Sequence, residues 1–222
     1  VVKETVAAGL GERFTNALLG SRSRRAWIGG HALALRGFAT PETVALEERK
    51  RGRLVAENLL ITVALDGWQP LTDHFEERYL GHPLSGPEIR AKRSLLRLLG
   101  RTLRRLHEER IHHYDLSARN LFVPETGEPR EVAILDLESL RTFPPLTRTR
   151  RATQLAQVLE TVGAAHWTDT AHLLRAYGIR DGRERRRWER RIERAARRRA
   201  QRREVRRIRR YGGVHSGPVA PS

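Results

Sequence analysis

Three residues with oxygen-bearing side chains stand at spacings that suit phosphoryl transfer. Asn120 follows Asp115 by five positions, and Asp136 comes sixteen positions after Asn120. Transfer of phosphate from ATP needs a carboxylate that orients the acceptor hydroxyl and takes its proton, and it needs oxygen ligands that hold Mg²⁺ on the phosphates. One amide and one carboxylate oxygen are enough, because Mg²⁺ keeps several waters and also binds phosphate oxygens. We expect Asp115 to be the catalytic base, and Asn120 and Asp136 to bind the metal and ATP.

The neighbouring elements should bring these residues together. Short apolar runs at 121–123 and 132–135 predict two buried strands, and the Pro and Gly residues between them predict a turn. Such a hairpin places Asn120 and Asp136 at the same end. The alternative is an ordinary loop followed by a hairpin, with no catalytic role. In that case the spacing of Asp115, Asn120 and Asp136 would be a coincidence.

Two motifs and an upstream segment resemble a known family. His113–Asn120 has the sequence HYDLSARN and follows the H-x-D-L-x-x-x-N pattern of a kinase catalytic loop. LFV follows directly, ILDLES occupies 134–139 and GFATPETVA occupies 37–45. With these segments the chain resembles the lipopolysaccharide kinase family, the bacterial sugar kinases that phosphorylate Kdo or heptose in the inner core. The loop motif alone is shared with aminoglycoside and choline kinases.

The resemblance implies an α+β, protein-kinase-like fold with two lobes. Residues 1–66 would form an N-terminal lobe that is truncated at its start, residues 67–182 would form the catalytic lobe, and a hinge would lie near Asp66. Lys3 would contact the ATP phosphates, and His113 would brace the catalytic loop through hydrogen bonds. The glycine-rich loop of such folds should precede Val1. The chain starts at Val1 and has no Met, so we expect it to be a fragment.

One residue of the kinase pattern is missing. A kinase fold usually pairs the strand lysine with a glutamate on the following helix. No acidic residue lies between Glu12 and Glu42, and the position expected for that glutamate falls near Ala26. Glu12 is the only nearby candidate for the partner of Lys3.

Hydrophobic periodicity predicts the remaining elements. We expect strands at 44–46 and 58–65, and helices over 12–36 with a break near Gly20, 70–79, 86–110, 148–162 and 168–177. Five leucines recur at helical spacing in the long helix and predict its buried face: Leu95, Leu96, Leu99, Leu103 and Leu106. His107, His112 and His113 cluster before the loop, but their spacing is poor for zinc and no Cys joins them.

Positive charge is concentrated near the carboxyl end. Residues 183–210 contain sixteen Arg and four Glu, which is most of the net charge of +17. We expect a basic helix over 183–211 with an apolar seam at Trp188, Ile192, Ala195, Ala196, Val205 and Ile208, followed by a flexible tail, 212–222. Such a helix can lie on an anionic membrane, bind nucleic acid, or simply pack along its seam. Aromatic side chains for base stacking are scarce, which argues against nucleic acid.

These observations lead to one expected function and two alternatives. We expect a kinase that uses ATP and Mg²⁺ to phosphorylate a lipid-linked Kdo or heptose. With no Cys, signal peptide or apolar run of about 20 residues, we place it in the cytoplasm, peripheral on the inner face of the bacterial inner membrane, with residues 183–210 against anionic lipid. The alternatives are a non-catalytic kinase-like binding module and a soluble small-molecule kinase.

Overall fold

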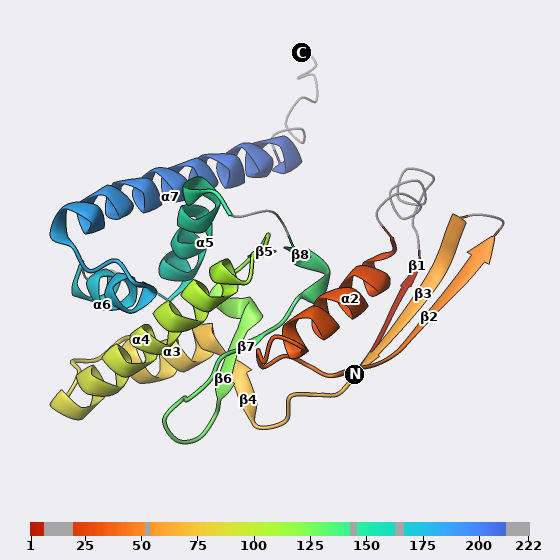
Figure 1. The fold of residues 1–222 in the computed structure, drawn as a ribbon, viewed down its shortest axis with the longest axis horizontal. Coiled ribbons are helices and arrows are strands. Elements are labelled where there is room, and N and C mark those ends of the chain that lie inside the picture. The colour runs from red at the N-terminus through yellow and green to blue at the C-terminus, as the bar shows by residue number, and fades with distance from the viewer. Residues whose placement is uncertain (7–19, 52–53, 143–145, 163–166, 212–222) are drawn as a thin grey trace, which may run out of the picture.

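The protein has a mixed α/β fold in which a small sheet lies at one end and helices fill the other (Figure 1). The computed structural model describes residues 1–6, 20–51, 54–142, 146–162 and 167–211. The three-stranded antiparallel sheet has the order β1-β3-β2, formed by β1 (Val2–Val6), β2 (Thr43–Arg51) and β3 (Leu54–Thr62). Helix α2 (Arg22–Ala34) packs against it. Gly20 has a φ of 78°, and the Ser21 side chain caps the start of α2. The part of the expected helix before Gly20, residues 12–19, lies outside the described residues.

The strands of this sheet differ from the expected boundaries. The predicted strands at 44–46 and 58–65 are too short and are shifted, since β2 extends to Arg51 and β3 starts at Leu54 and ends at Thr62. The outer end of this hairpin lacks long apolar runs, because β2 is polar from Glu47 to Arg51 and Glu57 and Asn58 interrupt β3. Arg49 Nη1 pairs there with Glu57 Oε2 at 3.0 Å. A search for apolar runs therefore misses it.

Two small ladders lie between the sheet and the helices. Strands β4 (Trp68–Pro70), β6 (Leu121–Pro124) and β7 (Ala133–Ile134) form one, and β5 (Ile111–His113) pairs with β8 (Leu140–Thr142) in the other. The predicted hairpin is confirmed, because β6 and β7 pair antiparallel with Leu121 opposite Ile134. Trp68–Pro70, just after the position expected for a hinge, pairs antiparallel with β6.

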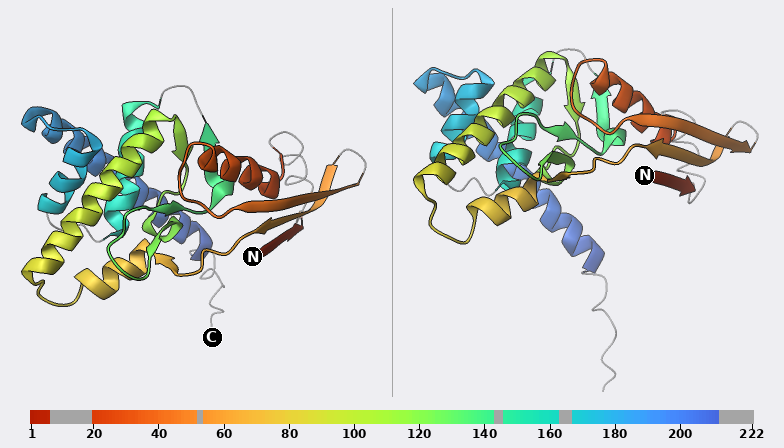
Figure 2. Two further views of the ribbon diagram at one scale, coloured as in Figure 1. Left: turned by 60° about the horizontal axis from the view of Figure 1, so that its bottom comes forward. Right: turned by 90° about the horizontal axis from the view of Figure 1, so that it is seen from below.

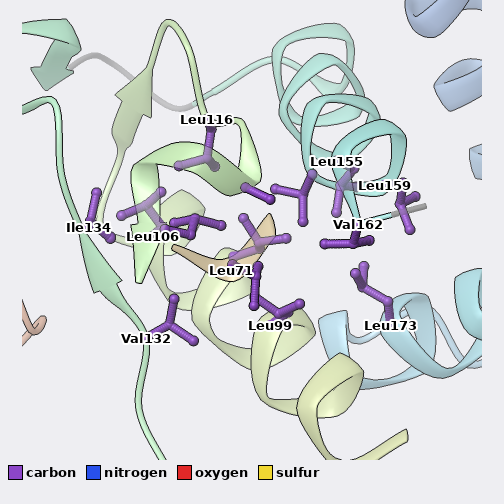
Figure 3. Packing of buried hydrophobic residues seen from close by; sticks show 14 of the residues in the cluster. Leu71, Leu99, Leu106, Leu116, Val132, Ile134, Leu155, Leu159, Val162 and Leu173 are labelled. Carbon is purple, nitrogen blue, oxygen red and sulfur yellow. The ribbon is translucent and has the colours of Figure 1, made fainter. Parts of the chain in front are cut away.

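The helices pack around α4 (Gly86–Glu108), which begins with a capping box formed by Ser85 and Glu88. All five leucines of its predicted stripe are at most 2 % exposed. Around this stripe lie α3 (Leu71–Tyr79), α5 (Arg148–Thr161) and α6 (Trp167–Tyr177), and their apolar side chains join one core with Leu116 and Ile134 (Figure 3). Burial of each such leucine is worth roughly 1.5–3 kcal/mol, and this core fixes the base on which the catalytic segment rests.

The basic helix α7 (Gly182–Tyr211) packs across α5 (Figure 1). Its apolar seam is shorter than the sequence suggests. Trp188 and Ile192 are buried and Ala195 and Ala196 pack against the core. Val205 and Ile208 are 48 % and 57 % exposed, because this half of α7 extends past the other helices (Figure 2).

No helix in the described ranges is both long enough and apolar enough to cross a bilayer.

The packing of α4 on α6 yields a test of the fold. A Cβ atom at Gly100 would lie 2.9 Å from the Ala176 Cβ and would overlap the Leu173 carbonyl oxygen. We expect Gly100→Ala to lower the free energy of unfolding by about 1–3 kcal/mol, measured by urea denaturation. Gly182→Ala, where the nearest atom is 3.8 Å away, is the matched control. Equal stability of the two variants would contradict this packing.

Candidate active site

The two ladders bring the predicted oxygen-bearing residues together. Asn120 directly precedes β6, and Asp136 follows β7 by one residue, so the hairpin places both at one end. The Leu135 N–H donates to the Asn120 carbonyl at 2.8 Å, which extends the pairing to this point. On the other ladder, the Tyr114 N–H donates to the Ser139 carbonyl at 3.0 Å. The backbone before Asp115 and the segment after Asp136 are therefore joined.

His113 is fully buried and connects the two segments through its imidazole ring. Its Nε2 lies 2.8 Å from the Leu135 carbonyl oxygen, and the Asp115 N–H donates to its Nδ1 at 3.2 Å. Nε2 must therefore carry the proton. Burial lowers the pKa of His113, against the opposing effect of the Leu135 carbonyl and the charges of Asp136 and Asp115. These are the bracing hydrogen bonds that the sequence suggested, and any further part of His113 in catalysis stays a prediction.

The side chains of Asn120 and Asp136 present oxygen atoms that fit a magnesium ion. The Asn120 Nδ2 donates to the Asp115 carbonyl at 2.7 Å, which turns the amide oxygen away from that contact. Asp136 has left-handed backbone angles, φ 53° and ψ 54°, and its Oδ2 accepts a hydrogen bond of 2.6 Å from the Ser139 hydroxyl. Residues held in this strained region often belong to functional sites. An amide and a carboxylate oxygen are the hard ligands that Mg²⁺ takes.

Two segments from the N-terminal part hold Asp136 from the other side. The Ile134 N–H donates to the Ala39 carbonyl at 2.9 Å, and the Thr40 hydroxyl donates to the Ile134 carbonyl at 3.0 Å. The segment 37–45 quoted above thus binds the strand that leads into Asp136. Helix α2 also approaches closely, because a Cβ at Gly29 would lie 2.5 Å from the Leu137 carbonyl oxygen.

Two buried glutamines of α5 support the catalytic loop from below, and the sequence analysis missed them. Gln157 accepts from the Leu116 N–H at 3.2 Å and donates to the Tyr114 carbonyl at 2.8 Å. Gln154 donates to the His113 carbonyl at 3.0 Å. Both are at most 1 % exposed. The only feature of the sequence that could have identified them is that two amide side chains, three residues apart, lie on the apolar face of a helix.

A buried chain of hydrogen bonds continues from Gln154 into the core. The Gln154 Oε1 lies 2.7 Å from His107 Nε2, and His107 Nδ1 lies 2.7 Å from the Tyr177 hydroxyl. Gln154 donates with its nitrogen, so its oxygen accepts from His107 and the Tyr177 hydroxyl donates to Nδ1. Burial lowers the pKa of His107 to about 4. The three histidines near the loop therefore serve separate contacts, since His112 stacks edge to face with Tyr114.

The side of the loop that carries Asp115 is open. Asp115, Tyr114 and Arg119 are all exposed, so an acceptor molecule can reach the Asp115 carboxylate. A cavity of about 240 Å³ lies elsewhere, between α2 and the β5–β8 ladder, with Ile28, Leu33 and Ile111 among its lining residues. Its lining contains none of the predicted catalytic or metal-binding residues.

A family model and a solved structure are similar to this chain. Residues 13–177 match the Lipopolysaccharide kinase (Kdo/WaaP) family. The chain belongs to that family. Family membership makes it a phosphotransferase that uses ATP. The structure of WaaP in complex with acyl carrier protein is similar in fold, with a TM-score of 0.62 and 22% sequence identity over 78% of this chain and 76% of that one. No curated protein matches the chain.

The lipopolysaccharide kinase match leaves two predicted features outside its range. Lys3 precedes residue 13, and its backbone lies in β1 opposite Leu60. The role of Lys3 stays a prediction. Helix α7 follows residue 177. The division into lobes at residue 66 also stays a prediction.

The missing helix glutamate has no substitute on α2. The helix contains no acidic residue, and Ala26 is buried in the core. In place of an ion pair, the Ser23 hydroxyl donates to Asn58 Oδ1 at 2.5 Å, and the Ser21 hydroxyl donates to Glu48 Oε1 at 2.6 Å. Glu12, the weak candidate for the partner of Lys3, lies outside the described residues.

Removal of Gln157 should disturb the loop. We expect Gln157→Leu to lower the free energy of unfolding by about 2 kcal/mol or more, because it leaves the Leu116 N–H and the Tyr114 carbonyl without their partner. The kcat of phosphate transfer should fall by a larger factor than the KM for ATP changes. The reason is that Gln157 fixes the Tyr114 carbonyl and the Leu116 N–H, one on each side of Asp115. Gln201→Leu on exposed α7 is the control and should stay within about 0.5 kcal/mol. Unchanged kcat in Gln157→Leu would contradict this support.

The buried His107 should make stability depend on pH. Its pKa is about 4 in the folded protein, against about 6.5 in the unfolded chain, so the unfolded state binds more protons between these values. Stability should be complete above pH 6.5 and should be lost as the pH falls toward 4. His107→Gln should reduce the slope of unfolding free energy against pH by about 1 kcal/mol per pH unit. Denaturant unfolding at several pH values tests this, and an unchanged slope would show that His107 is not responsible.

Proposed function

We propose that the protein transfers the γ-phosphate of ATP to a hydroxyl group of Kdo or heptose in the inner core of lipopolysaccharide. The proposal rests on one observation: hydrogen bonds connect His113, Asp115 and Asn120 with the segment that leads into Asp136. Membership of the lipopolysaccharide kinase family supports the acceptor class.

Asp115 is the residue that acts on the acceptor. Its carboxylate is exposed, and its backbone is fixed by His113 at the N–H and by Asn120 at the carbonyl. A carboxylate held in this way can accept a hydrogen bond from the sugar hydroxyl, orient its oxygen toward the phosphorus, and take the proton as the new bond forms.

Asn120 and Asp136 hold Mg²⁺ through the amide oxygen and the carboxylate. Bound Mg²⁺ neutralises negative charge on the phosphates of ATP. The left-handed conformation of Asp136 and the Ser139 hydroxyl on its Oδ2 fix the direction of the carboxylate before ATP arrives. Lys3 contacts the phosphates from β1. Glu138, two residues after Asp136, assists the metal or only stabilises the turn.

Helix α7 holds the enzyme near its lipid-linked acceptor. Each basic residue near an anionic membrane surface contributes about 1 kcal/mol, and Val205 and Ile208 add exposed apolar side chains to the same helix. The protein therefore acts in the cytoplasm, peripheral to the inner membrane. An enzyme with a lipid-linked acceptor needs this attraction to the membrane. An aminoglycoside-type or choline-type kinase, whose acceptor is a small soluble molecule, does not need it.

A truncation distinguishes these two acceptor classes. Trp188 and Ile192 belong to the core, so removal of residues 201–222 is preferable to removal of all of α7. Loss of transfer to membrane-embedded acceptor, with ATP hydrolysis retained, favours the lipid-linked acceptor. Equal activity of the truncated and full-length proteins on that acceptor would show that residues 201–222 do not hold the enzyme at the membrane.

The decisive assay is transfer from labelled ATP to lipopolysaccharide that lacks core phosphate, with and without Mg²⁺. We expect Mg²⁺-dependent incorporation that falls by at least about a hundredfold in Asp115→Asn and in Asp136→Asn. Asp73→Asn, an exposed aspartate on α3, is the control and should keep full activity. If the full-length protein transfers nothing and does not bind Mg·ATP, it is a kinase-like binding module instead.

A further inference from the structure

A groove lined with arginines lies between α5 and α7, apart from the catalytic loop. It has a volume of about 380 Å³, and Thr149 of α5 faces five arginines of α7 across it: Arg191, Arg194, Arg198, Arg199 and Arg202. These positions follow i, i+3, i+4 helical spacing and therefore share one side of α7. We call this site the arginine groove.

The positive charge of the arginine groove is not neutralised by its own lining. None of the described residues that line it is acidic. Glu160 lies at its edge, where its Oε2 pairs with Arg199 at 3.5 Å and with Arg203 at 2.7 Å. In the part of the chain that the structure describes, no ion pair involves Arg191, Arg194, Arg198 or Arg202. Like charges placed side by side repel, so this arrangement favours an external anion.

The geometry of the groove fits phosphate groups. Each guanidinium presents a planar set of N–H donors that matches the oxygens of a phosphate. Thr149 belongs to the first turn of α5, where the helix dipole also favours negative charge. Trp188 and Ile192 are buried and fix α7 against the core, so the part of the helix that carries the arginines is held beside α5.

We propose that the arginine groove binds a molecule that carries clustered phosphate groups. Five cations around one hollow require more negative charge than a single carboxylate supplies. Nucleic acid fits less well, because the lining contains no aromatic side chain on which a base can stack. This assignment follows from the arginines and does not depend on the kinase activity.

Two sources can supply such phosphates, a lipid headgroup or a soluble phosphorylated compound. A second hollow continues from the groove along α7, shares Arg198 and Arg202 with it, and reaches Val205. Val205 is 48 % exposed. Arginines beside an exposed apolar side chain suit a phosphorylated amphiphile, and this neighbourhood favours the lipid source.

The groove is also connected to the catalytic loop through α5. Thr149 lies on the groove side of this helix, while Gln157, two turns further along, binds the backbone around Leu116. The groove and the catalytic loop therefore contact the same helix.

The test compares two double variants of the full chain that remove the same charge from the same helix. Arg198→Gln with Arg202→Gln changes the groove. Arg186→Gln with Arg197→Gln changes two exposed arginines on the side of α7 turned away from it. All four side chains are exposed, and thermal unfolding should confirm that both variants remain folded.

Binding is measured without ATP, so that a failure of the proposed kinase activity does not affect the result. The lipid probe is a phosphatidylcholine vesicle that contains a small fraction of a bisphosphorylated diglucosamine lipid, with the dephosphorylated lipid as its control. The soluble probe is inorganic pyrophosphate at constant ionic strength. We expect the groove variant to bind the phosphorylated vesicle at least about tenfold more weakly than the parent, and the control variant less than about threefold more weakly.

The two probes identify the source. Binding to the vesicle without competition from pyrophosphate assigns the groove to a lipid headgroup, and equal competition by pyrophosphate assigns it to phosphate groups in general. Equal weakening in both double variants would overturn the proposal, because it would show diffuse attraction by the whole helix. The proposal would also be overturned if the parent protein bound neither the vesicle nor pyrophosphate.

Discussion

The site depends on one imidazole ring held between two backbone segments. His113 donates to the Leu135 carbonyl and accepts from the Asp115 N–H, so a single neutral tautomer joins the loop to the strand that leads into Asp136. Loss of either contact would leave a buried polar group without a partner, which costs more than a hydrogen bond contributes. The rest of the fold serves this arrangement: α5 supports the loop with two amides, and α2 and the segment at 37–40 hold the other strand.

Much of this arrangement follows from the sequence because its determinants are local. Asp115, Asn120 and Asp136 stand at fixed separations, and the apolar runs between them predict the hairpin that brings the last two together. The leucine stripe of α4 also predicts its own burial, since residues three and four apart on a helix share one face. In each of these cases the signal lies within a few residues of the feature that it predicts.

Features that depend on distant partners could not be found in this way. Gln154 and Gln157 resemble the polar residues of any surface helix, and only the loop folded over them makes them buried. Val205 and Ile208 continue the apolar spacing of α7 but remain exposed, because no other helix reaches that far. The outer end of the β2–β3 hairpin was missed for a related reason, since β2 is polar there and its strand structure depends on pairing with β3, where Val55 and Ala56 are buried.

The close contact between α2 and the segment after Asp136 has a mechanical consequence. At Gly29 the helix backbone approaches the Leu137 carbonyl, and a Cβ at Gly30 would lie 2.7 Å from Thr43 Cγ2 and 3.2 Å from Leu137 Cδ1. At Gly29 no side chain of α2 stands between the helix and the Leu137 backbone, and at Gly30 only the side chains of Thr43 and Leu137 fill the gap. A tilt or rotation of α2 would therefore press directly on the backbone next to Asp136 and on Thr43 at the start of β2.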